Sequence, residues 1–312
     1  MAGSLRGRSL VSLQEWSRDE ISLLLEVARQ AKAERRAGVV RRRFEGKSLA
    51  LIFEKRSTRT RSAFETAFGE EGGWVSFLST DDIHLGVKES VEDTARVLGR
   101  MYDAIEFRGY AQETVESLAR WAGVPVYNGL TDSDHPTQVL ADLLTLQEAF
   151  GRLEGLSLAF VGDGRNNMAH ALLTGLPKMG VSLTVVCPPE LAPRPEWLEA
   201  ARAASLPGAE VRVVHEPGEG VRGADAVYTD VWASMGEEDQ AEERRRILAP
   251  YQVNGALMAA TGRARSIFLH CLPANKGQEV SAELFESEVS RVFDQAENRK
   301  HTIKALMLVT LL

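Results

Sequence analysis

Short apolar runs alternate with longer amphipathic segments along the whole chain. In the first half, the runs KSLALIF, WVSFL, AIEFRG and VPVYNG are bounded by glycine or charged residues, as buried parallel strands are. The runs LSLAFVGDG, VSLTVVCPP, AEVRVV, ADAVYTDVW and IFLHCLP repeat this pattern in the second half. Helix-like segments such as ESVEDTARVLGRMY lie between the runs. The pattern predicts an α/β fold with two successive doubly wound, open parallel sheets.

The length of the chain agrees with two domains of similar size. A chain of 312 residues exceeds the usual size of one domain. The predicted boundary lies near FGRLEG, so residues 1–142 form the first domain and residues 151–290 the second. The last helix-like segment, residues 297–312, could pack on either domain, and we place it with the first.

Composition narrows the range of partners. The chain is 44% apolar and 26% charged, with a net charge of −7, which is typical of an ordinary globular protein. This balance provides no overall field that attracts nucleic acid or an acidic membrane, so an anion site must be local. The basic run Arg41–Phe44 lacks interleaved aromatic residues and is interpreted as a solvated connector.

Two further features bear on location and on metal or disulfide content. The N-terminal segment has no continuous apolar core like that of a signal peptide, and no run approaches about 18 apolar residues. We therefore expect a cytoplasmic protein without a membrane span. Cys187 and Cys271 lie far apart and form no C-x-x-C motif, which argues against a disulfide framework or a structural zinc site.

The segment RSTRTR is the first candidate for a site. It stands between the predicted strand SLALIF and the amphipathic segment SAFETAF, so Ser57 to Thr60 should form a turn and the start of a helix. Free backbone N–H groups at a helix start bind anions, and Arg59 adds a planar fork suited to phosphate. A phosphate site and a capped helix with surface arginines are both consistent with this segment alone.

Two other segments favour a phosphate next to a carbonyl group. Arg108 follows an apolar run, so it should stand at the carboxyl end of a strand, where open α/β sheets bind ligands. His135 precedes a proline at a predicted helix start, with Gln138 one turn later. The helix end should lower the pKa of His135 and keep it neutral. Taken singly, Arg108 could be a surface ion pair and His135 a capping residue.

Six motifs in order resemble those of the aspartate/ornithine carbamoyltransferase family. They are STRTR, FRG, HPTQ, GDGRNN, DVWASMG and HCLP, and the similarity extends from SLVSLQEWS to FDQAENRKHTIKALM. SMG and HCLP resemble the ornithine carbamoyltransferases rather than the aspartate branch. The resemblance implies a first domain for carbamoyl phosphate, a second for L-ornithine, and terminal helices that cross between them. It also implies a homotrimer, or an assembly of trimers, with shared active sites, and no cofactor or metal.

The resemblance also implies the roles of individual residues. Arg108, His135 and Cys271 are the implied catalytic residues. The implied carbamoyl phosphate ligands are Ser57, Thr58, Arg59, Thr60, Arg108, His135, Gln138, Cys271, Leu272 and Arg299, with His84 contributed to a neighbouring subunit. Other family members have glutamine at the position of His84, and an exposed loop histidine is the alternative. The implied ornithine ligands are Asn167, Asp230, Ser234 and Met235.

Three other functions are weighed against this one. Gly162 and Gly164 fit the start of a dinucleotide-binding fingerprint, but Asn167 occupies the third glycine position. The next strand ends in VVCPPE rather than placing an acid at the ribose-binding position. A non-catalytic relative with the same fold is a second alternative, although the expected ligand-binding residues are present. Transferases for putrescine or acetylornithine share the first domain and are the third. Biosynthetic and catabolic roles both remain open.

Overall fold

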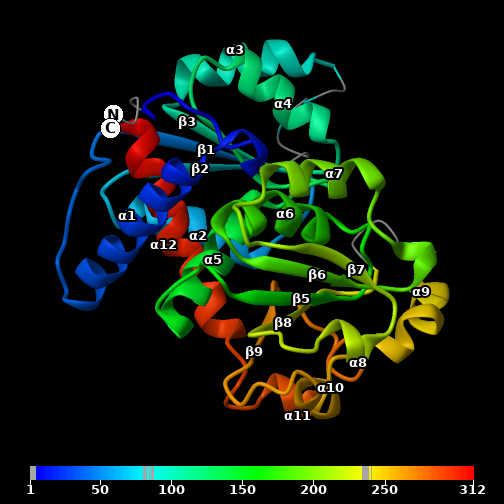
Figure 1. Cartoon of the computed structure of the whole chain (residues 1–312). Helices are drawn as coiled ribbons and strands as arrows, with labels where there is room; N and C mark the ends of the chain where they lie inside the picture. Colours follow the sequence, from blue (N-terminus) through cyan, green and yellow to red (C-terminus); the bar gives the residue numbers. More distant parts are fainter. Residues whose placement is uncertain (1–4, 80–82, 84, 86–87, 234–238, 240) are drawn as a thin grey trace. The chain divides into compact units, whose positions relative to one another are not determined.

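The chain folds into two compact units. The computed structural model describes residues 5–79, 83, 85, 88–233, 239 and 241–312. Unit 1 comprises Met1–Leu144 and Glu297–Leu312, and unit 2 comprises Thr145–Ala296. Figure 1 shows that each unit contains its own parallel sheet with helices packed on it.

Unit 1 is built on a four-stranded parallel sheet with the order β2-β1-β3-β4. Its strands are β1 (Ser48–Phe53), β2 (Trp74–Ser79), β3 (Ala104–Arg108) and β4 (Val126–Leu130). Its helices include α1 (Arg18–Arg36), α2 (Thr58–Gly69), α3 (Val91–Met101) and α4 (Gln112–Trp121), and a 3-10 turn, η1, covers Leu13–Glu15. Helix α1 begins with a capping box in which Ser17 and Glu20 satisfy each other's backbone N–H groups.

The two faces of this sheet carry different kinds of side chain. Ile105 and Phe107 of β3 pack with residues of α3 and α4 in one apolar cluster, and Figure 1 shows these two helices together on one side of the sheet. Successive side chains of a strand point to opposite faces. Glu106 and Arg108 therefore point to the other face, toward α2.

Unit 2 is built on a five-stranded parallel sheet with the order β7-β6-β5-β8-β9. Its strands are β5 (Ser157–Val161), β6 (Ser182–Val186), β7 (Val211–Val214), β8 (Ala226–Thr229) and β9 (Ile267–His270). Its helices are α6 (Asn167–Gly175), α7 (Pro195–Ala204), α8 (Pro217–Gly220), α9 (Ala241–Leu248), α10 (Gly255–Ala260) and α11 (Ala282–Phe285). Short 3-10 turns cover Pro177–Met179, Pro189–Leu191 and Ala249–Tyr251.

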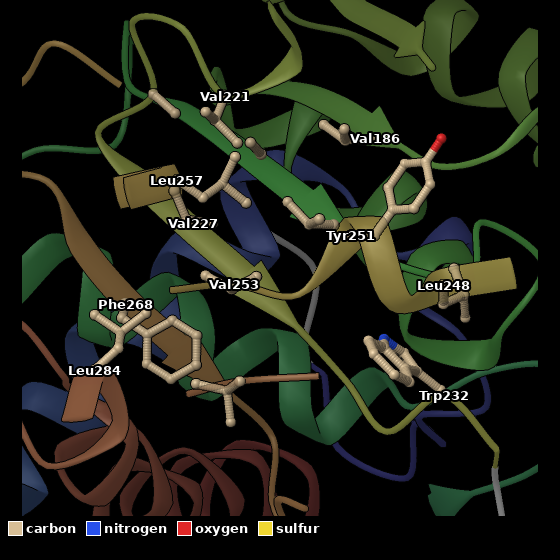
Figure 2. Packing of buried hydrophobic residues seen from close by; sticks show 14 of the residues in the cluster. Val186, Val221, Val227, Trp232, Leu248, Tyr251, Val253, Leu257, Phe268 and Leu284 are labelled. Carbon is tan, nitrogen blue, oxygen red and sulfur yellow. The ribbon is translucent and has the colours of Figure 1, made fainter. Parts of the chain in front are cut away.

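A large apolar cluster covers one face of the second sheet. Figure 2 shows Leu257 of α10 beside Val227 of β8, and Leu284 of α11 beside Phe268 of β9. Trp232, just after β8, packs in the same cluster with Leu248 at the end of α9. Burial of such side chains supplies the main stabilising free energy of the unit. This packing holds the ends of β8 and β9 in place.

Two helices carry the chain from one unit into the other. Helix α5 spans Pro136–Phe150 and α12 spans Val292–Leu311, and each contains a boundary between the units. The prediction of two open parallel α/β sheets is confirmed. In the described part of the chain, no helix combines the length and hydropathy that a membrane span requires.

The basic connector is more structured than its sequence indicated. Arg41 and Arg42 are exposed, as expected. Arg43, however, pairs with the buried carboxylate of Glu71 at 2.7 Å, and Phe44 is fully buried and stacks on Phe68. The interpretation as a solvated connector is therefore wrong for Arg43 and Phe44, because a partner 28 residues away cannot be read from local composition.

We expect Glu71→Gln to destabilise the protein by about 2 kcal/mol, the range for hydrogen bonds to charged groups. Lys304 lies 3.3 Å from the same carboxylate. Burial acts to raise the pKa of Glu71, but Arg43 and Lys304 outweigh it and the pKa is lowered. This part of the stability is present above the unfolded-state pKa and is lost as pH falls through the lower folded-state value.

Denaturant titrations at several pH values test this expectation. The exposed pair of Glu26 and Arg29 supplies the control, and Glu26→Gln should leave stability unchanged. Equal stability of Glu71→Gln and the unmutated protein at neutral pH would show that the pair contributes nothing.

Candidate active site

Each sheet has one point at which the chain changes the side to which it adds further strands. Polar residues lie near the carboxyl ends of the strands at this point. In unit 1 the reversal lies between β1 and β3, and in unit 2 it lies between β5 and β8. Open α/β sheets bind ligands beyond the carboxyl ends of the strands at such a point. The segments that follow these four strands are therefore the first places to look for ligand-binding side chains.

The start of α2 follows β1 and has the predicted form. Ser57 is the N-cap, and its hydroxyl accepts a hydrogen bond from the backbone N–H of Thr60 at 3.1 Å. Thr58 is exposed, and Ser57 and Arg59 are half-buried, so these side chains can meet a ligand. The helix start leaves backbone N–H groups available to an anion. The predicted turn and helix start at Ser57–Thr60 are confirmed.

Thr60 joins two arginines at this helix start. Its hydroxyl oxygen accepts hydrogen bonds from Arg108 Nη1 at 3.3 Å and from Arg299 Nη2 at 3.1 Å. Arg299 also donates to the hydroxyl of Thr137 at 3.3 Å. All four side chains are buried. Two guanidinium groups thus converge beside the amino end of α2, which creates a strongly cationic position for an anion.

His135 lies next to this cationic cluster and stays neutral. It immediately precedes Pro136, the first residue of α5. Burial lowers the pKa of His135 well below 6.5, and the charges of Arg299, Arg108 and Arg59 lower it further. The predicted direction is confirmed, and the largest cause is burial, followed by the three arginines. The Thr137 hydroxyl lies 3.5 Å from His135 Nδ1, and either of these two groups can be the donor.

Gln138 is buried one turn into α5. Its amide nitrogen donates to Asp142 Oδ1 at 2.8 Å. Within the described residues, its amide oxygen has no hydrogen-bond partner. The oxygen can therefore accept a hydrogen bond from an N–H group of a ligand.

In unit 2, Asp230 follows β8 and accepts three hydrogen bonds. Its Oδ1 accepts from Cys271 Sγ at 2.9 Å and from the backbone N–H of Val231 at 2.8 Å. Its Oδ2 accepts from Asn166 Nδ2 at 2.9 Å. The structure thus brings together Asp230 and Cys271, which are 41 residues apart. A carboxylate next to a thiol can bind a cation and take part in moving a proton.

Sequence reasoning missed Asn166. It is the N-cap of α6, where its amide oxygen accepts from the backbone N–H of Ala169 at 2.9 Å. Its amide nitrogen then holds Asp230. The resemblance pointed instead to Asn167, the first residue of α6. An asparagine directly before a helix is a capping signal, and a capping asparagine keeps an NH₂ group for a second partner.

His270 and Glu279 fix the chain around Cys271. His270 Nδ1 accepts from the backbone N–H of Leu272 at 2.9 Å, so the ring proton is on Nε2, which donates to Glu279 Oε1 at 3.3 Å. Leu272 has a φ of 61°, a conformation that costs a non-glycine residue about 1 kcal/mol or more. The hydrogen bond from Leu272 to His270 helps to hold this conformation directly after Cys271.

One set of potential metal ligands occurs among the described residues. Donor atoms of Asp230, His270 and Cys271 lie within 4.8 Å of one another. The thiol donates to Asp230, and His270 Nδ1 accepts from Leu272. A metal ion would have to displace both hydrogen bonds, so the donor set is better suited to its present hydrogen bonds.

The loop after β5 does not fit a pyrophosphate. Asp163 accepts from the backbone N–H of Arg165 at 2.9 Å and pairs with Arg244, so the loop already holds a negative charge, and the side chain of Asn166 caps the start of α6. A Cβ atom on Gly164 would lie 2.7 Å from the carbonyl oxygen of Leu191, so this glycine serves packing within the protein. These contacts argue against the dinucleotide-binding alternative.

The remaining candidate residues divide into two groups. His84, Ser234 and Met235 lie outside the described residues. Cys187 is fully buried, and burial, with a contribution from Asp163, raises the pKa of its thiol to about 12. Cys271 is therefore the better candidate for chemistry at neutral pH.

The two halves of the chain match two family models. Residues 8–148 match the aspartate/ornithine carbamoyltransferase carbamoyl-P binding domain. Residues 154–310 match the aspartate/ornithine carbamoyltransferase Asp/Orn binding domain. Together the two models account for nearly the whole chain.

Individual relatives agree with the family models. An ornithine carbamoyltransferase from Caldanaerobacter subterraneus subsp. tengcongensis is 64% identical, over 100% of both chains. A catabolic ornithine carbamoyltransferase from Streptococcus ratti is 49% identical, over 100% of this chain and 98% of the relative. The solved ornithine carbamoyltransferase from Pyrococcus furiosus has a TM-score of 0.95 and 43% identity, over 99% of both chains. The chain therefore belongs to the aspartate/ornithine carbamoyltransferase family.

Proposed function

We propose that the protein transfers the carbamoyl group of carbamoyl phosphate to the δ-amine of L-ornithine, giving L-citrulline and phosphate. The main support is the convergence of Arg108 and Arg299 on Thr60 at the start of α2, in a chain 64% identical to a named ornithine carbamoyltransferase. The cluster of Asp230, Cys271 and Asn166 supports an amino-acid site in unit 2.

Carbamoyl phosphate is assigned to unit 1. The phosphate group accepts hydrogen bonds from the hydroxyls of Ser57, Thr58 and Thr60 and from backbone N–H groups at the helix start, and Arg59 pairs with it through its planar fork. The half-buried and exposed positions of Ser57, Thr58 and Arg59 are compatible with this role. Arg299 adds charge from α12. The site thus neutralises a dianion with groups from the start of α2 and from α12.

The carbamoyl group is assigned to the residues beside the phosphate. Arg108 bridges a phosphate oxygen and the carbonyl oxygen, and His135 donates from Nε2 to the same carbonyl. The amide oxygen of Gln138 accepts from the carbamoyl NH₂ group, in keeping with the acceptor capacity described above. These donors point to the oxygen that becomes negative in the transition state.

The reaction needs positioning and charge stabilisation. The lone pair of the δ-amine attacks the carbonyl carbon, the C=O electrons move to oxygen, and the C–O bond to phosphate then breaks as phosphate leaves. The amine nitrogen loses one proton overall. Arg108 and His135 stabilise the oxyanion, while Arg59 and the helix start stabilise the leaving phosphate. Orientation of the two substrates supplies the rest of the acceleration.

L-Ornithine is assigned to unit 2. Asp230 pairs with the α-ammonium group, and Asn167, Ser234 and Met235 complete the binding of the amino acid. An alkyl ammonium has a pKa near 10.4, about three units above neutrality, so the site must favour the deprotonated δ-amine. Because the thiol of Cys271 donates to Asp230, its sulfur can orient the amine proton, or accept it while the thiol proton passes to Asp230. Cys271 and Leu272 are proposed to act where the substrates react.

The reaction is the same in two cellular settings. Relatives include one named ornithine carbamoyltransferase and one named as catabolic. We therefore propose the transfer itself, which serves arginine biosynthesis or arginine catabolism.

Product analysis with four amines tests the proposed reaction. Purified protein is supplied with carbamoyl phosphate and, in parallel, ornithine, putrescine, acetylornithine or aspartate. We expect citrulline from ornithine with at least about a hundredfold preference in kcat/KM, because a buried carboxylate rejects analogues that leave it unpaired. Equal turnover of putrescine would remove Asp230 as the partner of the α-ammonium. No turnover of ornithine would refute the proposed function.

We further propose a homotrimer, or an assembly of trimers, with His84 reaching a neighbouring subunit's site. Strand β2 is the edge of the first sheet, and none of its residues is fully buried. Trp74 at its start is 55% exposed. Open edges and exposed aromatic side chains are features that partner subunits cover. His84 follows this edge in the sequence.

Mixed assemblies test the shared site. Arg59→Ala should disable a subunit's own site and His84→Ala the neighbour's site, so each pure variant should be strongly impaired. Random co-assembly at equal ratio restores about a quarter of the sites in a closed ring. Activity at the weighted average of the two parents, in confirmed mixed trimers, would assign His84 to an exposed loop instead.

A further inference from the structure

A buried glutamate lies under the cationic cluster and has no part in the reaction described above. Glu106 occupies the middle of β3 and is fully buried. Its neighbours Ile105 and Phe107 face the apolar cluster with α3 and α4. Glu106 therefore faces the side of the sheet that carries Arg108, two residues along the same strand. The carboxyl group thus shares a face with the proposed phosphate site.

The packing around Glu106 is tight. A Cβ atom added to Gly129 of β4 would lie 1.8 Å from Glu106 Oε1 and 3.1 Å from Thr60 Cγ2. The carboxyl group therefore lies across Gly129, beside the residue on which Arg108 and Arg299 converge. Any side chain at position 129 would remove this space.

The hydrogen bonding of Glu106 is unusual for a structural residue. Within the part of the chain that the structure describes, neither carboxyl oxygen has a hydrogen-bond partner. Most buried polar groups in proteins are hydrogen-bonded, and an exception calls for a functional explanation. A carboxylate buried this way costs several kcal/mol unless nearby charge offsets it. The proton occupancy of Glu106 must therefore depend on the charges around it.

The charges around Glu106 act in opposite directions. Burial raises its pKa well above 4.5, and the guanidinium groups of Arg108 and Arg299 act to lower it. Arg59 and His135 belong to the same cluster. On β4, Tyr127 is paired with Glu106 in the sheet register, and burial raises the pKa of its hydroxyl, which stays protonated. A phosphate dianion at the arginines offsets their charge and raises the Glu106 pKa further.

We propose that Glu106 is a positioning residue that couples carbamoyl phosphate binding to the uptake of a proton. In the ligand-free protein, at pH values above the raised pKa of Glu106, its carboxylate balances the charge of Arg108 and Arg299. When the phosphate group takes over that balance, Glu106 gains a proton from solvent, and one O–H bond forms. This inference rests on the proposed binding of carbamoyl phosphate in unit 1.

Calorimetric titrations with sulfate and with inorganic phosphate test the coupling. Sulfate carries no titrating proton near neutrality, so protons taken up on its binding go to the protein. Titrations in buffers of different ionisation enthalpy, between about pH 6 and 9, count those protons. We expect the unmutated protein to take up as much as about one proton per site more than Glu106→Gln. His135 is present in both proteins, so its contribution cancels in the comparison.

The affinity of Glu106→Gln gives a second measurement with a defined sign. Glutamine imitates the protonated acid, so the variant should bind sulfate more tightly than the unmutated protein at high pH, by up to about tenfold per unit of linked pKa shift. The two affinities should converge as pH falls. Structural damage would weaken binding instead. The exposed residue Glu116 of α4 supplies the matched control, and Glu116→Gln should behave like the unmutated protein.

The possible outcomes separate this inference from the proposed function. Equal proton uptake and equal pH dependence in Glu106→Gln, with citrulline formed normally by the unmutated protein, would overturn the role of Glu106 alone. Failure of the unmutated protein to form citrulline or to bind either anion would overturn both. If Glu106→Gln does not fold, difference infrared spectra of the unmutated protein, with and without sulfate, test the coupling instead. A carboxylic acid band that grows on sulfate binding supports the coupling, and its absence refutes it.

Discussion

Replacing Arg108 by lysine should lower kcat/KM for carbamoyl phosphate by about 10²–10³-fold, the cost of losing one well-placed oxyanion donor. Lysine keeps the positive charge but offers a single ammonium group instead of a planar fork. It offers one nitrogen, whereas the planar fork of Arg108 carries five N–H groups on three nitrogens, and one of these nitrogens donates to Thr60. Because the buried charge is retained, the thermal midpoint should change little.

Steady-state kinetics with varied carbamoyl phosphate, together with thermal melts, check this result. Arg100 on α3 is exposed and donates to the backbone carbonyl of Arg96 in its own helix, so Arg100→Lys is the matched control and should retain full activity. Full activity in Arg108→Lys would mean that charge alone suffices and that the fork geometry is unimportant.

Asp230→Asn should reduce kcat/KM for ornithine by about 10³-fold, since removal of one member of a buried charge pair costs about 2–5 kcal/mol. The asparagine loses the charge proposed to hold the α-ammonium. Its NH₂ group also opposes a donor, because Asp230 accepts from both Asn166 and Cys271.

Binding measurements separate this effect from general damage. The affinity for carbamoyl phosphate should be unchanged, because its proposed ligands in unit 1 are intact. Asp294 is largely exposed, with 61% of its side chain accessible, and Asp294→Asn should not alter kinetics. An unchanged KM for ornithine in Asp230→Asn would show that a group other than Asp230 binds the α-ammonium.

Each of the nine apolar runs in the sequence corresponds to a strand of the structure. Parallel strands covered on both faces must be apolar along their whole length, and β1 is buried at every position. The helix that follows RSTRTR was also predictable, because Ala63, Phe64, Ala67 and Phe68 recur at helical spacing and are all buried. Local patterns therefore sufficed for the architecture.

The candidate site was predictable only in part. Arg108 and His135 could be placed because each stands at the end of an element whose position the pattern indicates. Arg299 lies inside a helix and entered only through family resemblance, since nothing local marks its contact with Thr60. Asn166 and Glu106 were missed for the same reason. Asp230, the partner of Asn166, and Gly129 and Thr60, which lie beside Glu106, are far away in the sequence, and local periodicity does not encode such contacts.

The hydrogen bond between Thr60 and Arg299 has a consequence for folding during synthesis on the ribosome. A ribosome that adds about 5–20 residues per second needs roughly 10–50 s to make the 239 residues that separate this pair. Throughout that time the nascent first sheet can form, but its anion-binding cluster lacks one of its two converging guanidinium groups. The protein therefore cannot complete this cluster during synthesis of its first half, and the last helix to emerge finishes the site.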